Sequence, residues 1–146
     1  MDIDGACHCG LIKYDAVIDP RTVVVCHCTD CQTLSGSAFR TIVGAARDDF
    51  RLRGGQPKIY VKTTESGVKR AQAFCPECGT PIYSAAVGDT PAFAIRVGTI
   101  RQRAELPPHR QYWCRSALPW VMDLDSVAQF ERQDDLNRFL GNVRRS

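Results

Sequence analysis

The stretch Phe74-Cys75-Pro76-Glu77-Cys78-Gly79-Thr80-Pro81 contains a Cys-x-x-Cys turn that is followed by a glycine. A glycine at this position supplies the positive φ that lets a chain turn around a metal ion, so the turn is a candidate zinc knuckle. A structural zinc takes four thiolates at the corners of a tetrahedron, and this knuckle supplies two. The other ligands of such a site have to come from elsewhere in the chain.

Seven of the eight cysteines lie in three short groups, which are Cys7-His8-Cys9, Cys26-His27-Cys28-Thr29-Asp30-Cys31 and Cys75-Pro76-Glu77-Cys78. Residues i and i+2 of an extended segment point to the same side, so Cys7 with Cys9, or Cys26 with Cys28, present two sulfurs to one point. The histidine between each pair then faces away and is a weak ligand candidate. This spacing predicts metal binding, and disulfides are poor candidates.

Seven thiolates divide into a set of four and a set of three, which predicts two zinc ions per chain. One division pairs Cys7 and Cys9 with Cys75 and Cys78, and leaves Cys26, Cys28 and Cys31. Three protein ligands with an exchangeable fourth position are typical of a reactive zinc. Spacing leaves alternatives open, because two of the middle cysteines could instead join Cys75 and Cys78. His27 or Cys114 could also close the second site and make it purely structural.

Short segments rich in aromatic and β-branched residues predict a mainly antiparallel β body. We expect strands over residues 11–18, 38–43, 50–53, 58–63, 82–87, 92–97 and 111–115. Gly54-Gly55-Gln56-Pro57 predicts a hairpin loop between two of them. Leu136, Phe139 and Leu140 follow a helical period behind Asp134, which predicts one short C-terminal helix.

Length and charge limit the class of protein. A chain of 146 residues predicts a single domain over 1–146, and its 19 basic residues are scattered, which argues against nucleic acid as a partner. The longest apolar run, 23–26, is far short of the ~18 residues of a membrane span, so we exclude a membrane protein. Met1-Asp2-Ile3-Asp4-Gly5 lacks the pattern of a signal peptide. We therefore expect a cytoplasmic protein with reduced cysteines.

Outside the clusters, several residues are interpreted as structural and not as functional. Trp113, Cys114 and Trp120 are interpreted as buried packing residues, and His109 as a loop or packing residue. Arg40 and Arg70 are interpreted as solvated strand residues, with anion binding near a metal site as the alternative.

Three motif-bearing segments resemble the glutathione-dependent formaldehyde-activating enzyme family, which also contains centromere protein V. They are Gly5-Ala6-Cys7-His8-Cys9-Gly10-Leu11-Ile12-Lys13-Tyr14, Cys26-His27-Cys28-Thr29-Asp30-Cys31-Gln32-Thr33-Leu34-Ser35-Gly36-Ser37-Ala38-Phe39 and Phe74-Cys75-Pro76-Glu77-Cys78-Gly79-Thr80-Pro81. Val97-Gly98-Thr99-Ile100, Pro108-His109, Trp120 and Asp123 extend the similarity to about residues 5–131. The resemblance implies a β-tent fold, a structural zinc on Cys7, Cys9, Cys75 and Cys78, and a catalytic zinc on Cys26, Cys28 and Cys31.

The activity that the resemblance implies is that of a carbon–sulfur lyase, in which glutathione adds to formaldehyde to give S-hydroxymethylglutathione. The expected partners are glutathione or a similar small thiol, together with a small aldehyde. Arginines would hold the carboxylates of glutathione, and we expect backbone N–H groups of Ser35-Gly36-Ser37 to assist them. Arg101-Gln102-Arg103 stands where the family usually has acidic residues, so the surface beside the site is a candidate for selecting a different adduct. The rival hypotheses are a scaffold with two inert zinc ions and a redox-sensitive zinc store.

Overall fold

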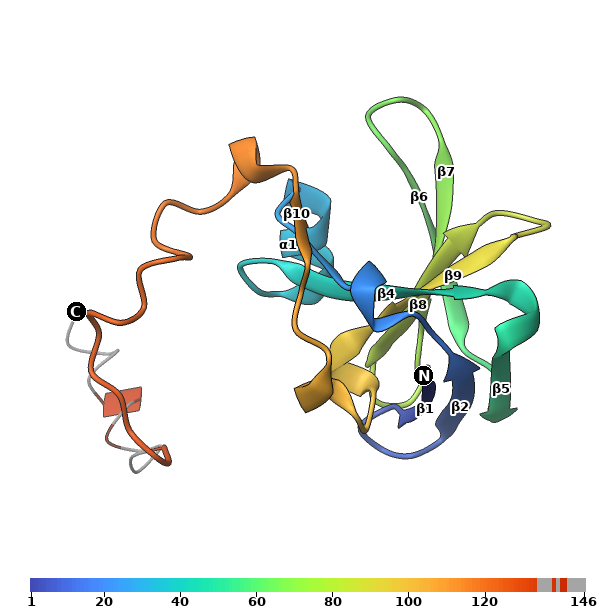
Figure 1. Ribbon diagram of the computed structural model, residues 1–146, viewed down its shortest axis with the longest axis horizontal. Coiled ribbons are helices and arrows are strands. Elements are labelled where there is room, and N and C mark those ends of the chain that lie inside the picture. The colour runs from blue at the N-terminus through green and yellow to red at the C-terminus, as the bar shows by residue number, and fades with distance from the viewer. Residues whose placement is uncertain (134–137, 139, 142–146) are drawn as a thin grey trace.

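Two β-sheets form the body of the protein (Figure 1). The computed structural model describes residues 1–133, 138, 140 and 141. Within them, the smaller sheet is antiparallel and has the order β1 (Asp2–Ala6), β2 (Ile12–Val17) and β5 (Phe50–Gly54). The larger sheet has seven strands in the order β10 (Arg110–Tyr112), β3 (Val24–Cys26), β4 (Arg40–Ala46), β9 (Ala92–Arg96), β8 (Pro81–Ala86), β7 (Lys69–Phe74) and β6 (Lys58–Thr63). The predicted mainly β class is confirmed, and the pair β10 with β3 is parallel.

The hydrophobic core lies where the two sheets face each other. Along β2 every second residue is buried, so Ile12, Tyr14 and Ala16 share one face. Tyr14 stacks against Phe50 with ring centroids 5.4 Å apart, and Phe50 in turn contacts Tyr83 of the larger sheet at 5.4 Å. Aromatic pairs of this kind contribute roughly 0.5–1.5 kcal/mol beyond the area that they bury. The core therefore joins the two sheets next to the strand ends that carry cysteines.

The structure adds a short helix that the sequence analysis did not predict. Helix α1 (Thr29–Ser35) begins after Cys28, whose Sγ accepts the N–H of Cys31 at 3.3 Å. It ends at Gly36, which adopts a left-handed φ of 61°. Seven residues are too few to show a helical period in the sequence. The Gly36 and Ser37 N–H groups donate to helix carbonyls, so the expectation that they bind a carboxylate is wrong.

The sequence patterns also did not predict three of the strands, which are β1, β3 and β7. The sequence of β7, Lys-Arg-Ala-Gln-Ala-Phe, has no β-branched residue, so its two neighbours in the sheet determine its conformation. The predicted C-terminal helix falls partly on Arg138, Leu140 and Gly141, which are helical. Its other members, Asp134, Leu136 and Phe139, lie outside the described residues.

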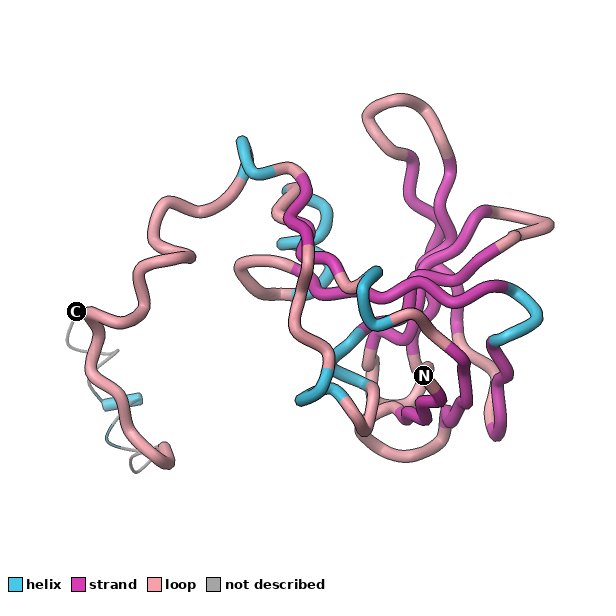
Figure 2. The backbone as a smooth tube through the Cα atoms, viewed as in Figure 1, coloured by secondary structure: helices cyan, strands magenta, loops and turns pink. Residues whose placement is uncertain are grey.

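The segment after β10 leaves the sheets and runs away from them (Figures 1 and 2). The strand expected over 111–115 ends at Tyr112, because Trp113 adopts a left-handed φ of 58°. Trp113, Cys114 and Trp120 are exposed, so their interpretation as buried packing residues is wrong. His109 is an exposed loop residue, as expected. In the described part of the chain no helix is long and apolar enough to cross a membrane.

Candidate metal centres

Four cysteines from distant parts of the chain meet in one cluster, the tetrad, which consists of Cys7, Cys9, Cys75 and Cys78. All four sulfurs lie within 4.8 Å of one another. The Cys7 and Cys9 sulfurs are 3.6 Å apart, and those of Cys9 and Cys75 are 3.8 Å apart. Sulfurs bound to a tetrahedral zinc at 2.3 Å are about 3.8 Å from each other. The tetrad therefore fits a closed four-thiolate metal site.

Two tight loops hold the tetrad cysteines in place. In the loop after β7, the Gly79 N–H donates to the Cys75 carbonyl at 2.9 Å, and Gly79 has a positive φ of 74°. In the loop after β1, the Gly10 N–H donates to the Cys7 carbonyl at 3.1 Å, with φ at 81°. Only glycine adopts this conformation without a steric penalty. The predicted knuckle geometry is confirmed at both loops.

Hydrogen bonds favour the thiolate at two of the four tetrad cysteines. The Ile12 N–H donates to the Cys7 sulfur at 3.2 Å, and although burial raises the pKa of Cys7, hydrogen bonds led by this one lower it overall. The side chain and the backbone of Thr80 lower the pKa of Cys78 to about 5. The Thr80 hydroxyl also accepts the His8 N–H at 3.1 Å and so connects the two loops. Thiolates are the form that binds zinc.

The other three clustered cysteines form the triad, which consists of Cys26, Cys28 and Cys31. Cys26 ends β3, Cys28 precedes α1, and Cys31 lies in the first turn of that helix. Their sulfurs lie within 4.8 Å of one another. The structure thus groups the seven cysteines as four and three, which decides the pairing that spacing left open. Two clusters of this composition are consistent with two metal sites.

Neither alternative ligand joins the triad. His27 is buried, and its Nε2 lies 2.8 Å from the Gln111 amide oxygen. Cys114 is exposed and belongs to neither cluster of the described residues. Within the part of the chain that the structure describes, the triad therefore offers three thiolates and no fourth protein ligand.

A buried arginine contacts the triad. Arg40 opposes Cys26 in the sheet, and its Nε and Nη2 donate to the Cys31 sulfur at 3.3 and 3.0 Å. The Cys26 thiol and then Arg40 lower the pKa of Cys31 to about 5, against the effect of burial. The pKa of Cys26 is raised by the same neighbouring thiolate and by burial. The interpretation of Arg40 as a solvated residue is wrong, because its side chain is buried against the Cys31 sulfur.

Sequence reasoning missed three other buried polar residues on the same face of the larger sheet, which are Gln72, Ser84 and Arg96. Nothing in a strand such as Ala92-Phe93-Ala94-Ile95-Arg96 shows that its arginine is buried. Only the register of the neighbouring strands reveals that these side chains share a face with Arg40.

The profile of a family described as glutathione-dependent formaldehyde-activating enzyme matches residues 2–116, a region that contains both cysteine clusters. The chain belongs to this family. The match stops short of Trp120 and Asp123 in the extended segment. None of the curated proteins compared with the chain matches it in sequence.

The fold is also similar to that of a solved structure, the crystal structure of a Rhodobacter sphaeroides protein from a structural genomics programme. The TM-score is 0.59 at 18% identity, and the match covers 74% of this chain and 98% of that chain. At this identity the likeness shows the fold alone. The assignment of this chain to the family therefore rests on the sequence match, and the grouping of the cysteines agrees with it.

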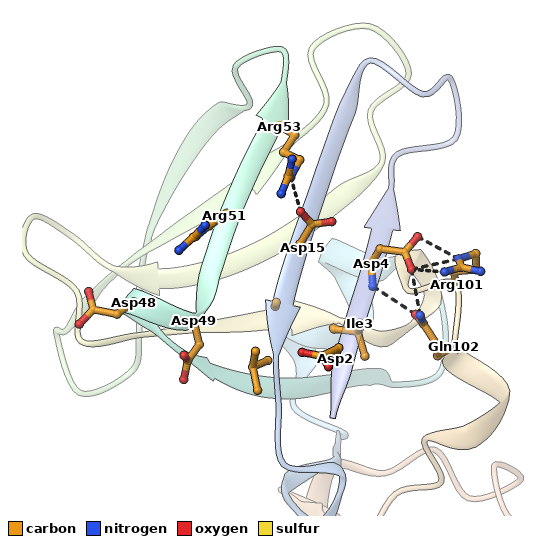
Figure 3. A pocket seen from close by; sticks show the side chains of 12 residues that line it. Asp2, Ile3, Asp4, Asp15, Asp48, Asp49, Arg51, Arg53, Arg101 and Gln102 are labelled. Carbon is orange, nitrogen blue, oxygen red and sulfur yellow. Dashed lines mark hydrogen bonds and ion pairs between the residues drawn. The ribbon is translucent and has the colours of Figure 1, made fainter.

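The segment in which this chain departs from the expected family pattern lies beside the smaller sheet (Figure 3). Arg101 donates from Nε to both carboxylate oxygens of Asp4, at 3.0 and 2.9 Å, and Gln102 donates to the same carboxylate at 2.9 Å. These contacts hold the pKa of Asp4 below its usual value. Within the described chain, the hydrogen bonds of Arg101 and Gln102 do not involve the triad. The expectation that this segment selects the adduct finds no support in these contacts.

Proposed function

We propose that this chain is a zinc-dependent carbon–sulfur lyase that joins a small thiol to a small aldehyde and reverses the same step. The pair favoured by the family is glutathione and formaldehyde, which give S-hydroxymethylglutathione. In this proposal the tetrad holds a structural zinc and the triad holds the catalytic zinc. The supporting observation is that the triad presents three thiolates, one short of a closed tetrahedral site.

The triad supplies a place for the thiol sulfur. A zinc ion there would bind that sulfur and keep it deprotonated, as free thiols with a pKa near ~8.5 are mostly protonated at neutral pH. Cys26 and Cys31 are buried and Cys28 is half-buried, so access is from the Cys28 side. Arg40 donates to the Cys31 sulfur and so offsets part of the negative charge that three thiolates would bring to the site. The fourth position is thereby left for a ligand from solution.

The reaction balances without a redox partner. The thiolate sulfur donates an electron pair to the aldehyde carbon and forms the new carbon–sulfur bond. The carbonyl π electrons move to oxygen, which takes up the proton that the thiol lost. In the reverse direction the hydroxyl loses its proton and the carbon–sulfur bond breaks. We further propose a cytoplasmic setting, where thiols stay reduced.

The experiment is a comparison of glutathione with its S-methyl ether, which cannot form a thiolate. Calorimetry on the zinc-loaded protein should show much tighter binding of glutathione, and adduct formation can be followed by nuclear magnetic resonance with labelled formaldehyde. Cys28→Ala should abolish glutathione binding and adduct formation. Cys114→Ala, which changes a cysteine outside the tetrad and the triad, should leave the two readouts unchanged. Equal affinity for the two ligands would favour the scaffold hypothesis.

A further inference from the structure

The face of the larger sheet that carries Cys26 also carries a buried polar row. Arg40 pairs with Cys26 in register, Arg96 pairs with Ile42 two residues further along β4, and Gln72 pairs with Ser84. Alternation along each strand puts these side chains on one face, opposite the core. All four polar residues of the row, Arg40, Gln72, Ser84 and Arg96, are more than nine-tenths buried. Such burial is unusual for a face that does not pack on the core.

The sheet edge and helix α1 come together over this face. Lys62 of β6 donates to Asp30 of α1 at 2.8 Å, and Asp30 lies between the second and third triad cysteines. β6 is the edge strand farthest from β3 along the sheet, so this contact requires the sheet to curl. The curled face lines a half-open pocket of about 420 Å³, whose walls include Leu34, Arg40, Tyr60, Gln72, Phe74 and Arg96. The pocket thus has two arginines in a largely apolar wall.

The two arginines of the pocket have no acidic partner among the described residues. The Gln72 amide oxygen accepts from Arg40 Nη1 at 3.2 Å and from Arg96 Nη2 at 3.0 Å. The remaining contacts of Arg96 are neutral oxygens of Ser84 and Ala94, and its buried Nε has no hydrogen-bond partner within the described chain. Burial and then Arg40 lower the pKa of Arg96 to about 9. A buried guanidinium whose hydrogen-bond partners are all neutral, and whose Nε is free, is suited to take up an anionic ligand.

The charges on the pocket lining favour an anionic ligand. A divalent zinc on three thiolates and the substrate thiolate would carry a net charge of −2, which Arg40 and Arg96 together offset. Lys58 adds a third positive charge to the lining, and the Arg96 Nε has no hydrogen-bond partner among the described residues. A carboxylate suits this site, because guanidinium groups bind carboxylates in strong charge-assisted hydrogen bonds.

We propose that this pocket binds a carboxylate of the thiol substrate, so that the enzyme selects thiols that carry a carboxylate on a short, partly apolar chain. The inference rests on the proposed function, since it assigns the sulfur to the triad. Arg40 touches both the Cys31 sulfur and Gln72, and it therefore spans the distance between the sulfur site and the carboxylate site. Arg96 is the specificity-determining residue. Leu34, Tyr60 and Phe74 contact the apolar part of the ligand.

The test compares two thiols that differ only in one charge, mercaptopropionate and mercaptopropionamide, by calorimetry on the zinc-loaded protein. We expect the acid to bind roughly 10- to 100-fold more tightly, as a charge-assisted hydrogen bond implies. Arg96→Met should remove this preference and leave the affinity for the amide unchanged, and Arg96→Lys should retain part of it. Arg51→Gln removes one positive charge from an exposed residue that lines a different pocket, and it should leave the affinities for both thiols unchanged.

Several outcomes would overturn the inference. If the wild-type protein binds the acid and the amide equally tightly, the inference is wrong, and this result does not require Arg96→Met to fold. If Arg96→Met loses affinity for the acid and the amide alike, the inference is also wrong, because Arg96 would then act on the thiolate sulfur that both ligands share and not on the carboxylate.

The thioether of mercaptopropionate, which cannot form a thiolate, separates this inference from the proposed function. If the thioether competes through its carboxylate while mercaptopropionate itself forms no adduct with formaldehyde, the pocket stands and the lyase proposal fails. If adducts form but thiols with a carboxylate are not preferred, the lyase proposal stands and the pocket inference fails.

Discussion

Arg40 donates two hydrogen bonds to the sulfur of Cys31, from Nε at 3.3 Å and from Nη2 at 3.0 Å. The arginine is on β4, directly opposite Cys26 on β3, and is itself buried. A guanidinium in this position stabilises the thiolate of Cys31 before any metal binds. The same side chain reaches Gln72 and the pocket. Arg40 therefore connects the candidate metal centre to the candidate substrate site.

Replacing Arg40 should raise the pKa of Cys31 in the metal-free protein. Cys31 titrates at about 5 because Cys26 and Arg40 favour its thiolate, and Arg40→Met removes the second of these effects. A thiolate absorbs in the ultraviolet, so the absorbance change on titration should move to higher pH in the variant. Arg40→Lys keeps a charge and should move it less. An unchanged titration curve would show that the contact has no influence on the thiolate.

The stability of the metal-free protein should depend on pH through the same residue. The pKa of Cys31 in the folded protein, about 5, lies below its ordinary value of 9.0. A group with a lowered pKa stabilises the fold fully above its ordinary pKa and loses that contribution as pH falls through the lowered value. Melting temperature should therefore fall from pH 9 towards pH 5, more steeply in wild type than in Arg40→Met. Parallel curves for the two proteins would contradict this.

Metal analysis of protein purified without chelators should find about two zinc ions per chain. The reason is the grouping of seven thiolates into a set of four and a set of three. A value of one zinc after reconstitution would eliminate the two-site hypothesis. Cys114→Ala is the matched control and should retain both ions.

The two clusters should respond differently to the loss of a cysteine. Cys75 is fully buried in the tetrad, so Cys75→Ala should lower the melting temperature strongly or leave the chain insoluble. Cys28 is half-buried in the triad, and Cys28→Ala should keep the fold while it loses one zinc. Thermal unfolding with metal analysis measures both. Equal losses of melting temperature in the two variants would show that the roles are not divided.

Gly79 offers a test of the knuckle geometry. Its φ of 74° is unfavourable for residues with a Cβ, so Gly79→Ala should cost about 1–2 kcal/mol in free energy of unfolding. Asparagine tolerates this conformation better, and Gly79→Asn should cost less. Gly98→Ala is the control, because a Cβ there meets nothing within 4 Å and the backbone is not left-handed. Similar losses for Gly79→Ala and Gly98→Ala would reject the argument.

The sequence by itself determined the chemistry that is available and much of the local structure. Cysteines at Cys-x-Cys and Cys-x-x-Cys spacing, with a glycine after each tetrad loop, predict metal-binding knuckles because neighbouring residues define such geometry. Alternating burial along β2 likewise depends on residues close in sequence. Both kinds of pattern are visible in a single chain, and the structure confirms them.

Only the tertiary structure decided which distant groups share a site. Cys7 and Cys75 meet because two sheets bring their loops together, and Arg40 reaches Cys31 because β4 pairs with β3 in one register. Arg101, by contrast, pairs with Asp4 at the surface (Figure 3). The charges of these arginines are identical in the sequence. Their burial and partners differ because sheet pairing and curvature, which depend on long-range contacts, place one in a buried polar row and the other at the surface.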